Sequence, residues 1–503
     1  AAWALAGRIN FGSWVDALVG PQGTALSVGT YLQAAAVNRA VKATSKRGFI
    51  SYYDRSVLAR IVAAPAQAWS SQRFWDAMNR IDVALLERIE EAYVSSAMEE
   101  FGIEAEALVY DGTNFHTFIA STNPKAPIAQ RGHAKNKRFD LRLVGLALAC
   151  STDHRIPLAH IATAGNAPDS KVFAASLPKL VARLEAIGVD PASVTVVFDK
   201  GNNSEANLAA VSGAIGFVGS LVPTQHQDLL AVPDEDFREV EDIPGVVAYR
   251  ATKQIYGVDR TIVVTRSENF LAKQLVGLAQ TRSRVEVGLA ELVRLLAGGR
   301  HKMDRHKLQA RVDEALAPRW MSRLYRIEIS GETKEDLALS WSFDEAAFAA
   351  LKSSELGKRI IFTDRAAWTT RQIVVAYRSQ WEAEAAFRQL KDHEHAAFRP
   401  IYHWTDQKIR VHALYAVASL MLVNLIWREA DKAGLGMSPN EVMEALAAIQ
   451  EVTLIYPPAK GKGNPRILRK LSRMDQPQRD LFQVFNLAAF APHEGTTAKW
   501  AGI

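Results

Sequence analysis

Residues 104–223 alternate short apolar runs with amphipathic stretches, in an order that restricts the fold. Three apolar runs come first, ALVYDGTNFHTFIA, RLVGLALAC and RIPLAHIATA. An amphipathic stretch, DSKVFAASLPKLVARLEAIG, then leads to VTVVFDKG, SEANLAAVS and GFVGSLVP. These lengths and periods predict three strands, a helix, a strand, a helix and a strand. Short turns favour antiparallel neighbours and helical crossovers add parallel strands, so we expect an α/β fold with a mixed sheet.

The regions on either side have different patterns. Residues 1–103 have apolar residues at helical spacing and predict a helical N-terminal region. Residues 224–358 are too long for a loop of a compact domain, and we expect an inserted, mainly β subdomain there. Residues 359–430 return to the core with the strand GKRIIFTD and further helices, and residues 431–503 predict a C-terminal helical region.

Composition narrows the function only slightly. The net charge of +6 and the pI near 9.2 favour an anionic partner without identifying it. The chain has one cysteine, Cys150, which lies in an apolar run. A disulfide framework is therefore excluded and a zinc cluster is not expected. This cysteine content is consistent with a protein of the reducing cytoplasm. We see no secretion signal pattern, and the uncharged run 411–427 is shorter than the roughly 20 apolar residues of a membrane span. A buried helix and no membrane association are expected.

Two aspartates follow strongly apolar runs. Asp111 comes after ALVY, and Asp199 comes after VTVVF. Each alone is better explained as a turn or cap residue. In the expected sheet the first and fourth strands can be neighbours, and two adjacent carboxylates repel each other unless a cation lies between them. Magnesium favours such oxygen ligands, so the pair predicts a divalent cation site.

A later helical stretch, YRSQWEAEAAFRQLKD, supplies a third carboxylate. At about 100° per residue, one stripe of the helix holds Tyr377, Gln380, Trp381, Glu384, Phe387, Arg388 and Lys391. Glu382 points about 140° away from Tyr377 and is predicted to face solvent or a neighbouring element. Glu384 is therefore the better candidate, although a core-facing stripe with snorkelling charges gives the same pattern. Three carboxylates can hold two metals about 4 Å apart and promote attack on a phosphodiester.

Together these residues resemble the DDE transposases of bacterial insertion sequences, in the group with a tyrosine, arginine, glutamate, lysine signature on the catalytic helix. Tyr377, Glu384 and Lys391 match that signature in identity and spacing, and Trp381 stands in its aromatic position. Gln380 stands at the arginine position, with Arg378 and Arg388 nearby. The segments YDGTNF, GHAKNKRFDLRLV, AGNAPDSKVF and VFDKGNNS are similar to segments of the family in the same order.

The resemblance implies a ribonuclease H-like catalytic core and a metal-dependent endonuclease that cleaves insertion-sequence ends and transfers strands into target DNA. Asp111, Asp199 and Glu384 would then be the catalytic metal ligands for Mg²⁺, with Mn²⁺ as a substitute. It also implies a homodimer that holds two double-stranded terminal inverted repeats, a bacterial cytoplasm with the nucleoid as the place of action, and a hairpin intermediate whose extruded base lies near the signature helix. Trp381 is suitably placed for that base, and the helical N-terminal region would bind DNA ends.

Basic and polar residues are the candidates for DNA contacts. The set from the basic segments and the catalytic helix is Lys46, Arg47, Arg131, Lys135, Lys137, Arg138, Tyr377, Arg378, Gln380, Trp381, Arg388 and Lys391. Phosphate contacts of this kind weaken steeply with salt. A solvated charged loop is the alternative for the basic segments, and for a second one, Lys460 to Arg473, the two interpretations are equally good.

Two other functions use the same residues. A transposase-derived DNA-binding protein would bind ends without cutting them, and the three intact carboxylates argue against it. A metal-dependent nuclease or phosphatase without strand transfer shares the carboxylates, but it explains neither the long insertion nor the helical N-terminal region.

Overall fold

The computed structural model describes residues 1–492 apart from residues 22, 24, 133–137, 212, 299–302, 332, 334–335 and 458–464. The chain forms two compact units. The first consists of Ala1–Phe217 and Arg378–Ile503, and the second is Val218–Tyr377.

The first unit contains a mixed sheet in the order β3-β2-β1-β4. Its strands are β1 (Ala107–His116), β2 (Leu143–Ser151), β3 (Pro157–Ala164) and β4 (Thr195–Val197). β2 is antiparallel to both β1 and β3, whereas β4 runs parallel to β1 after the crossover helix α8 (Asp169–Ala186). α9 (Glu205–Val211) then leads to β5 (Gly216–Ser220). The predicted order of three strands, helix, strand, helix and strand is confirmed.

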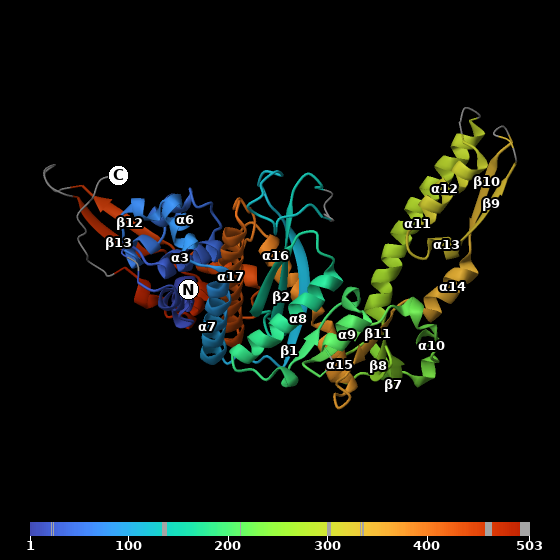
Figure 1. The fold of residues 1–503 in the computed structure, drawn as a ribbon, viewed down its shortest axis with the longest axis horizontal. Helices are drawn as coiled ribbons and strands as arrows, with labels where there is room; N and C mark the ends of the chain where they lie inside the picture. Colours follow the sequence, from blue (N-terminus) through green and yellow to red (C-terminus); the bar gives the residue numbers. More distant parts are fainter. Residues whose placement is uncertain are drawn as a thin grey trace. The chain divides into compact units, whose positions relative to one another are not determined.

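A buried helix, α17 (Asp406–Lys432), joins the sheet of the first unit to its N-terminal helices. It packs against α3 (Val28–Val41), α7 (Val83–Phe101), β3 and α16 (Gln380–Lys391) (Figure 1). This helix is long and apolar enough to cross a membrane, yet 94% of its most apolar window is buried inside the structure. Residues 411–427 are thus part of a buried helix, as predicted.

Helices account for the rest of the N-terminal region. They are α1 (Ala2–Arg8), α2 (Phe11–Val19), α4 (Phe49–Asp54), α5 (Leu58–Ile61) and α6 (Ser71–Asn79), besides α3 and α7. Because α3 and α7 pack on α17, these residues share one unit with the sheet.

The C-terminal region differs from the prediction. It contains α18 (Pro439–Ala447), β12 (Glu451–Tyr456), β13 (Arg466–Leu471) and α19 (Gln476–Val484). β12 and β13 pair as an antiparallel hairpin. The prediction of a helical region was wrong for the segment between α18 and α19, where Val452, Leu454 and Tyr456 alternate with the period of a strand.

The second unit has strands in the order β5-β11-β8-β7-β6, the first of which begins in the other unit. β7 (Val246–Ile255) and β8 (Val258–Ser267) form a hairpin that turns at Tyr256 and Gly257, both with positive φ. β11 (Lys358–Thr363) pairs with β8, and β6 is the short strand Arg238–Glu239. The predicted boundary at residue 359 is therefore displaced, since β11 and α15 (Thr370–Arg378) up to Tyr377 belong to this unit.

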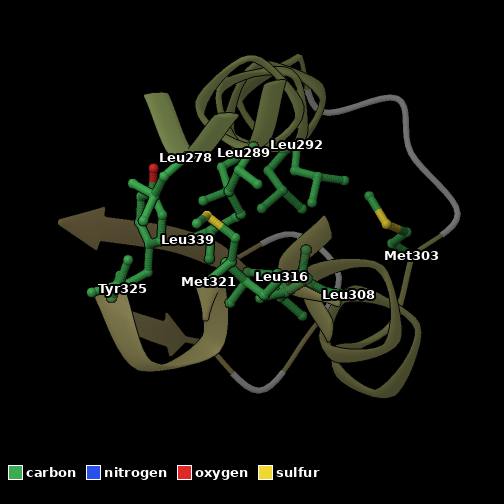
Figure 2. Close-up of a cluster of buried hydrophobic side chains, with 14 of the residues drawn as sticks. Leu278, Leu289, Leu292, Met303, Leu308, Leu316, Met321, Tyr325 and Leu339 are labelled. Carbon is green, nitrogen blue, oxygen red and sulfur yellow. The ribbon is translucent and has the colours of Figure 1, made fainter. Parts of the chain in front are cut away.

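Helices dominate the remainder of the second unit, which corrects the expectation of a mainly β insertion. The elements are α11 (Glu268–Ala297), α12 (Arg305–Leu316), α13 (Met321–Leu324), β9 (Tyr325–Ser330), β10 (Ala338–Phe343) and α14 (Glu345–Ser354). Figure 2 shows Leu278, Leu289 and Leu292 of α11 directed toward Met321, Leu316 and Leu339 in a common hydrophobic core. Leucines at helical spacing along α11 form one side of this core. The insertion is therefore organised around a helix and not around its hairpins.

Leu289 offers a direct test of this core. Its side chain is 0% exposed, whereas Leu295 on the same helix is 42% exposed. We expect Leu289→Ala to lower the free energy of unfolding by about 2–5 kcal/mol because it leaves a cavity. Leu295→Ala is the matched control and should change it by less than about 0.5 kcal/mol. Urea denaturation followed by circular dichroism measures both, and equal losses would contradict the assignment of this core.

Candidate active site

Asp111 lies in the middle of β1, on the face of the strand that carries α16. Its neighbour Tyr110 points to the opposite face, where its ring lies 5.1 Å from that of Phe173 on α8. Thr113 shares the face of Asp111 because side chains alternate along a strand. The Lys391 ammonium group of α16 donates a hydrogen bond to Thr113 Oγ1 at 2.7 Å. Asp111 is therefore directed toward the side of the sheet on which α16 packs.

Asp199 follows β4 at the level of Asp111. In the parallel pair, Val109 lies opposite Val197, and each aspartate stands two residues further along its own strand direction. Phe198, between Val197 and Asp199, packs on Phe173 at 4.9 Å. Asp199 itself is exposed and Asp111 is partly buried. The prediction that the first and fourth strands are neighbours is confirmed, and the two aspartates stand at matching levels of these strands.

Glu384 lies on the exposed face of α16. Trp381, Glu384 and Arg388 are all exposed, and the opposite face buries Ala383, Ala386, Phe387 and Leu390. Three members of the predicted stripe thus share one open surface. Phe387, placed in that stripe from the sequence, is only 3% exposed and instead packs the helix.

The signature stretch is not one continuous helix. α15 ends at Arg378, Ser379 forms a turn, and α16 begins at Gln380. The positions around the helix that were predicted by counting about 100° per residue from Tyr377 therefore do not apply across this break. Tyr377 is 5% exposed, and its ring lies 5.7 Å from the Arg359 guanidinium, so the tyrosine is far less open to a DNA phosphate than predicted.

An ion pair holds the first turn of α16. Glu382 lies 3.1 Å from the Nε of Arg155, and both side chains are buried. The Arg155 guanidinium also lies 4.6 Å from the ring of Trp427 and 5.4 Å from that of Trp381. The prediction allowed Glu382 to face either solvent or a neighbouring element, and the structure shows that it faces a neighbouring element. Burial raises the pKa of Glu382 although Arg155 opposes the shift.

Arg155 belongs to a turn that also binds α17. The turn follows β2 and has positive φ at His154 and Arg155. Asp153 accepts a hydrogen bond from Arg428 Nε at 2.6 Å, and His154 Nε2 lies 3.1 Å from an Asp431 carboxylate oxygen. This turn was not predicted from the sequence, where its signal is the charged stretch TDHR between two apolar strands. Two helices and the sheet meet at it.

The remaining candidates for DNA contacts lie in different environments. Arg47, Arg131, Arg138, Arg378 and Arg388 are exposed, and Gln380 is partly buried. Arg138 pairs with Asp140 at 2.7 Å. Lys135 and Lys137, like Lys460 and Lys462, fall outside the described residues. Arg466, Lys470 and Arg473 of the second basic segment are exposed.

Lys46 does not point to solvent. Its ammonium group donates to the Tyr415 hydroxyl at 2.8 Å and lies 3.2 Å from His403 Nε2. Burial lowers the pKa of Lys46 well below its ordinary value, with a further contribution from Arg39. A phosphate contact by Lys46 is therefore not supported, because its donors are used to fix the segment after α3 onto α17.

Three carboxylates are the candidate ligands for a divalent cation. Carboxylate oxygens from Asp111, Asp199 and Glu384 are the ligand type that Mg²⁺ prefers. Over the described part of the chain, however, no three His, Cys, Asp or Glu side chains are grouped closely enough to hold a metal ion. The carboxylates of Asp111 and Asp199 are suitable ligands for a hard cation. Glu384 does not lie close enough to them in this structure to complete a three-carboxylate site.

Comparisons with known proteins bear on the same segment. Residues 103–317 match the family model described as a transposase DDE domain. The match supports a DDE transposase; it includes Asp111 and Asp199 and ends before α16. No curated protein matches the chain. A similar solved structure is the piggyBac transposase synaptic complex with hairpin DNA, at 8% identity and a TM-score of 0.39, covering 89% of this chain and 78% of that one. That similarity is too low to transfer function.

Removing the Glu382 carboxylate should be costly. Glu382→Ala leaves the Arg155 guanidinium buried without its counter-charge, and we expect the free energy of unfolding to fall by about 3 kcal/mol. Glu384→Ala, an exposed change on the same helix, is the control and should stay within about 0.5 kcal/mol. Chemical denaturation compares the two variants. A Glu382 variant as stable as the Glu384 variant would show that the ion pair does not hold α16.

Proposed function

We propose that this protein is a DDE transposase that cuts DNA at the ends of an insertion sequence and joins those ends to target DNA. The observation that carries the proposal is the placement of Asp111 and Asp199 at matching levels of adjacent parallel strands, inside the segment that matches a transposase DDE domain. α16 packs on β1 and β2, and Glu384 lies on the exposed face of that helix, which supports it as the third carboxylate.

The three carboxylates are proposed to hold Mg²⁺, or Mn²⁺ in its place. A divalent cation, when bound, would neutralise charge on the scissile phosphate and favour ionisation of the attacking water or sugar hydroxyl. Asp111 and Asp199 present acceptor oxygens from a rigid sheet. Glu384 is exposed on α16, and the proposal requires its side chain to turn toward the aspartates when DNA is bound.

Other residues are proposed to bind and orient the DNA. Lys391 is held beside β1 by Thr113, so its positive charge lies on the face of the aspartates. Arg388 shares the exposed stripe with Glu384, and Arg378 lies just before the helix break. Arg47, Arg131 and Arg138, with Lys135 and Lys137, are proposed phosphate contacts. Binding of two double-stranded ends by a homodimer, and action in a bacterial cytoplasm, remain part of the same proposal.

Second-strand cleavage is proposed to pass through a hairpin intermediate, in which the Trp381 ring receives the extruded base. An extruded base costs a few kcal/mol unless an aromatic ring receives it. The Trp381 ring is 50% exposed, whereas Phe387 on the same helix is buried. This difference favours a binding role for Trp381, because Phe387 packs the helix onto the sheet whereas Trp381 remains open.

Substitution of each carboxylate tests the catalytic proposal. We expect Asp111→Asn, Asp199→Asn and Glu384→Gln each to reduce cleavage of a terminal-repeat duplex by at least about 100-fold. Affinity for that duplex should change by less than about threefold, since binding depends mainly on phosphate contacts. Glu394→Gln, an exposed change just beyond α16, is the matched control. Gel analysis of cleavage with Mg²⁺ provides the measurement, and full activity of any carboxylate variant would remove that residue from the site.

The Trp381 proposal makes a step-specific prediction. Trp381→Ala should leave first-strand nicking near the wild-type rate and reduce hairpin formation by about tenfold or more, because about 1–3 kcal/mol of base stacking is lost. Trp381→Phe should restore most of the hairpin, and Phe387→Ala should lower the melting temperature instead. Denaturing gels resolve nick from hairpin. Double-strand cleavage without any hairpin species would reject this route.

A further inference from the structure

Three aromatic side chains remain exposed at a place that the catalytic proposal does not use. Phe118, Tyr402 and Trp404 are 46%, 59% and 43% exposed. Phe118 follows the end of β1, and Tyr402 and Trp404 lie in the segment between α16 and α17. All three belong to the first unit. We call Phe118, Tyr402, Trp404 and the adjoining Trp75 the aromatic platform.

The rings of the platform lie side by side in pairs. The centroids of Phe118 and Tyr402 are 5.5 Å apart with 40° between the planes. Those of Trp404 and Trp75 are 6.1 Å apart with 33° between the planes. Within these tilted pairs, Tyr402 and Trp404 keep about half of their surface exposed.

Lysines accompany the rings. Lys125 Nζ lies 4.9 Å from the centre of the Trp404 ring, and Lys408 Nζ lies 4.7 Å from that of Trp75. Lys408 is buried and its ammonium group donates to Asn79 Oδ1, so it supports Trp75 from inside. Lys125 is exposed, and a cation held over an aromatic face by the ring quadrupole stays available to an anion. The platform therefore offers apolar faces and positive charge together, the combination that binds bases and phosphates of an unpaired strand.

The platform stands on a fixed scaffold. Phe118 N donates to Ile401 O at 2.9 Å, which ties the end of β1 to the segment of Tyr402. Asn123 Nδ2 donates to Trp404 O at 2.7 Å. The buried guanidinium of Arg142 donates to Asn123 O and Ala126 O, each at 2.7 Å, and so fixes the loop that carries Lys125. The exposed rings are thus held in place before any partner arrives.

The platform is also within reach of the proposed catalytic edge. Phe118 follows Asp111 by seven positions, so an extended chain spans at most about 25 Å between them. This length corresponds to about seven stacked nucleotides at about 3.4 Å each. A DNA strand whose phosphate lies at Asp111 can therefore extend to the rings.

We infer that the aromatic platform binds unpaired bases of the DNA strand next to the cleavage site, with Tyr402 and Trp404 stacking on the bases and Lys125 contacting a phosphate. The inference rests on the proposed function. It adds a second binding site for unpaired nucleotides, separate from Trp381 on α16. Such a site would bind DNA ends with opened base pairs beside the cut more tightly than fully paired ends.

Affinity for unpaired DNA tests the inference. The probes are a fluorescein-labelled oligothymidylate and a blunt duplex of the same length, and fluorescence anisotropy gives both dissociation constants. Tyr402→Ala/Trp404→Ala should weaken oligothymidylate binding by about tenfold or more, as expected for the loss of two stacking contacts. Binding of the duplex should change by less than about threefold. Tyr402→Phe/Trp404→Phe keeps the rings and should bind the oligothymidylate nearly as the wild type does.

Control variants separate base stacking from a change in folding or assembly. Tyr456→Ala removes a ring that is 47% exposed on β12 and should leave both affinities unchanged. The melting temperature of each variant shows that it folds. Unchanged oligothymidylate binding by the alanine variant would overturn the inference, as would an equal loss for both probes or a change in oligomeric state. The catalytic proposal would survive these outcomes if the duplex is still cut with Mg²⁺, whereas absence of binding to any DNA would reject both.

Discussion

The parallel pairing of β1 with β4 is the interaction on which the candidate site depends. β1 is the only described strand of the first unit that pairs with antiparallel β2 on one edge and parallel β4 on the other. The pairing of Val109 with Val197 places Asp111 and Asp199 at one level. A shift of one residue in either strand would turn one carboxylate to the α8 side of the sheet, because side chains alternate. The apolar partners of the sheet fix that register, so hydrophobic packing determines where the charges lie.

α16 is fastened to this sheet at both ends, and Glu384 lies between these two points on the exposed face of the helix. The ion pair of Glu382 with Arg155 holds the first turn, and the hydrogen bond of Lys391 to Thr113 holds the last. Glu384 lies between these anchors with no packing role. The two glutamates therefore have separate tasks, since one stabilises the position of the helix and the other is available for chemistry. Tyr402 and Trp404 are likewise exposed side chains on a segment that hydrogen bonds hold in place. This arrangement supports a preorganised ligand-binding surface.

Periodicity in the sequence predicted the order of the elements, whereas contacts between distant segments could not be predicted from it. Apolar runs were sufficient for the strand order, the buried α17 and the adjacency of the two aspartates. The helical angles favoured Glu384, but they could not show the break at Ser379 or the arginine that Glu382 meets, because Arg155 comes from a turn more than two hundred positions away. Lys46 looked like a surface charge in a basic linker, and only the fold reveals Tyr415 and His403 around it. The core that the leucines of α11 form with α12 and α13 depends on long-range packing, so the sequence pattern of residues 224–358 did not predict it.

Binding of Mn²⁺ is the most direct test that Asp111 and Asp199 act as a pair. Electron paramagnetic resonance of Mn²⁺ with the wild-type protein and a terminal-repeat duplex should show a bound ion. Asp111→Asn and Asp199→Asn should each weaken that binding by about tenfold or more, and the double variant should be little weaker than either single variant, because residues that share one site are not additive. Unchanged Mn²⁺ affinity in the single variants, or independent additive losses, would contradict a shared site at Asp111 in β1 and Asp199 just after β4.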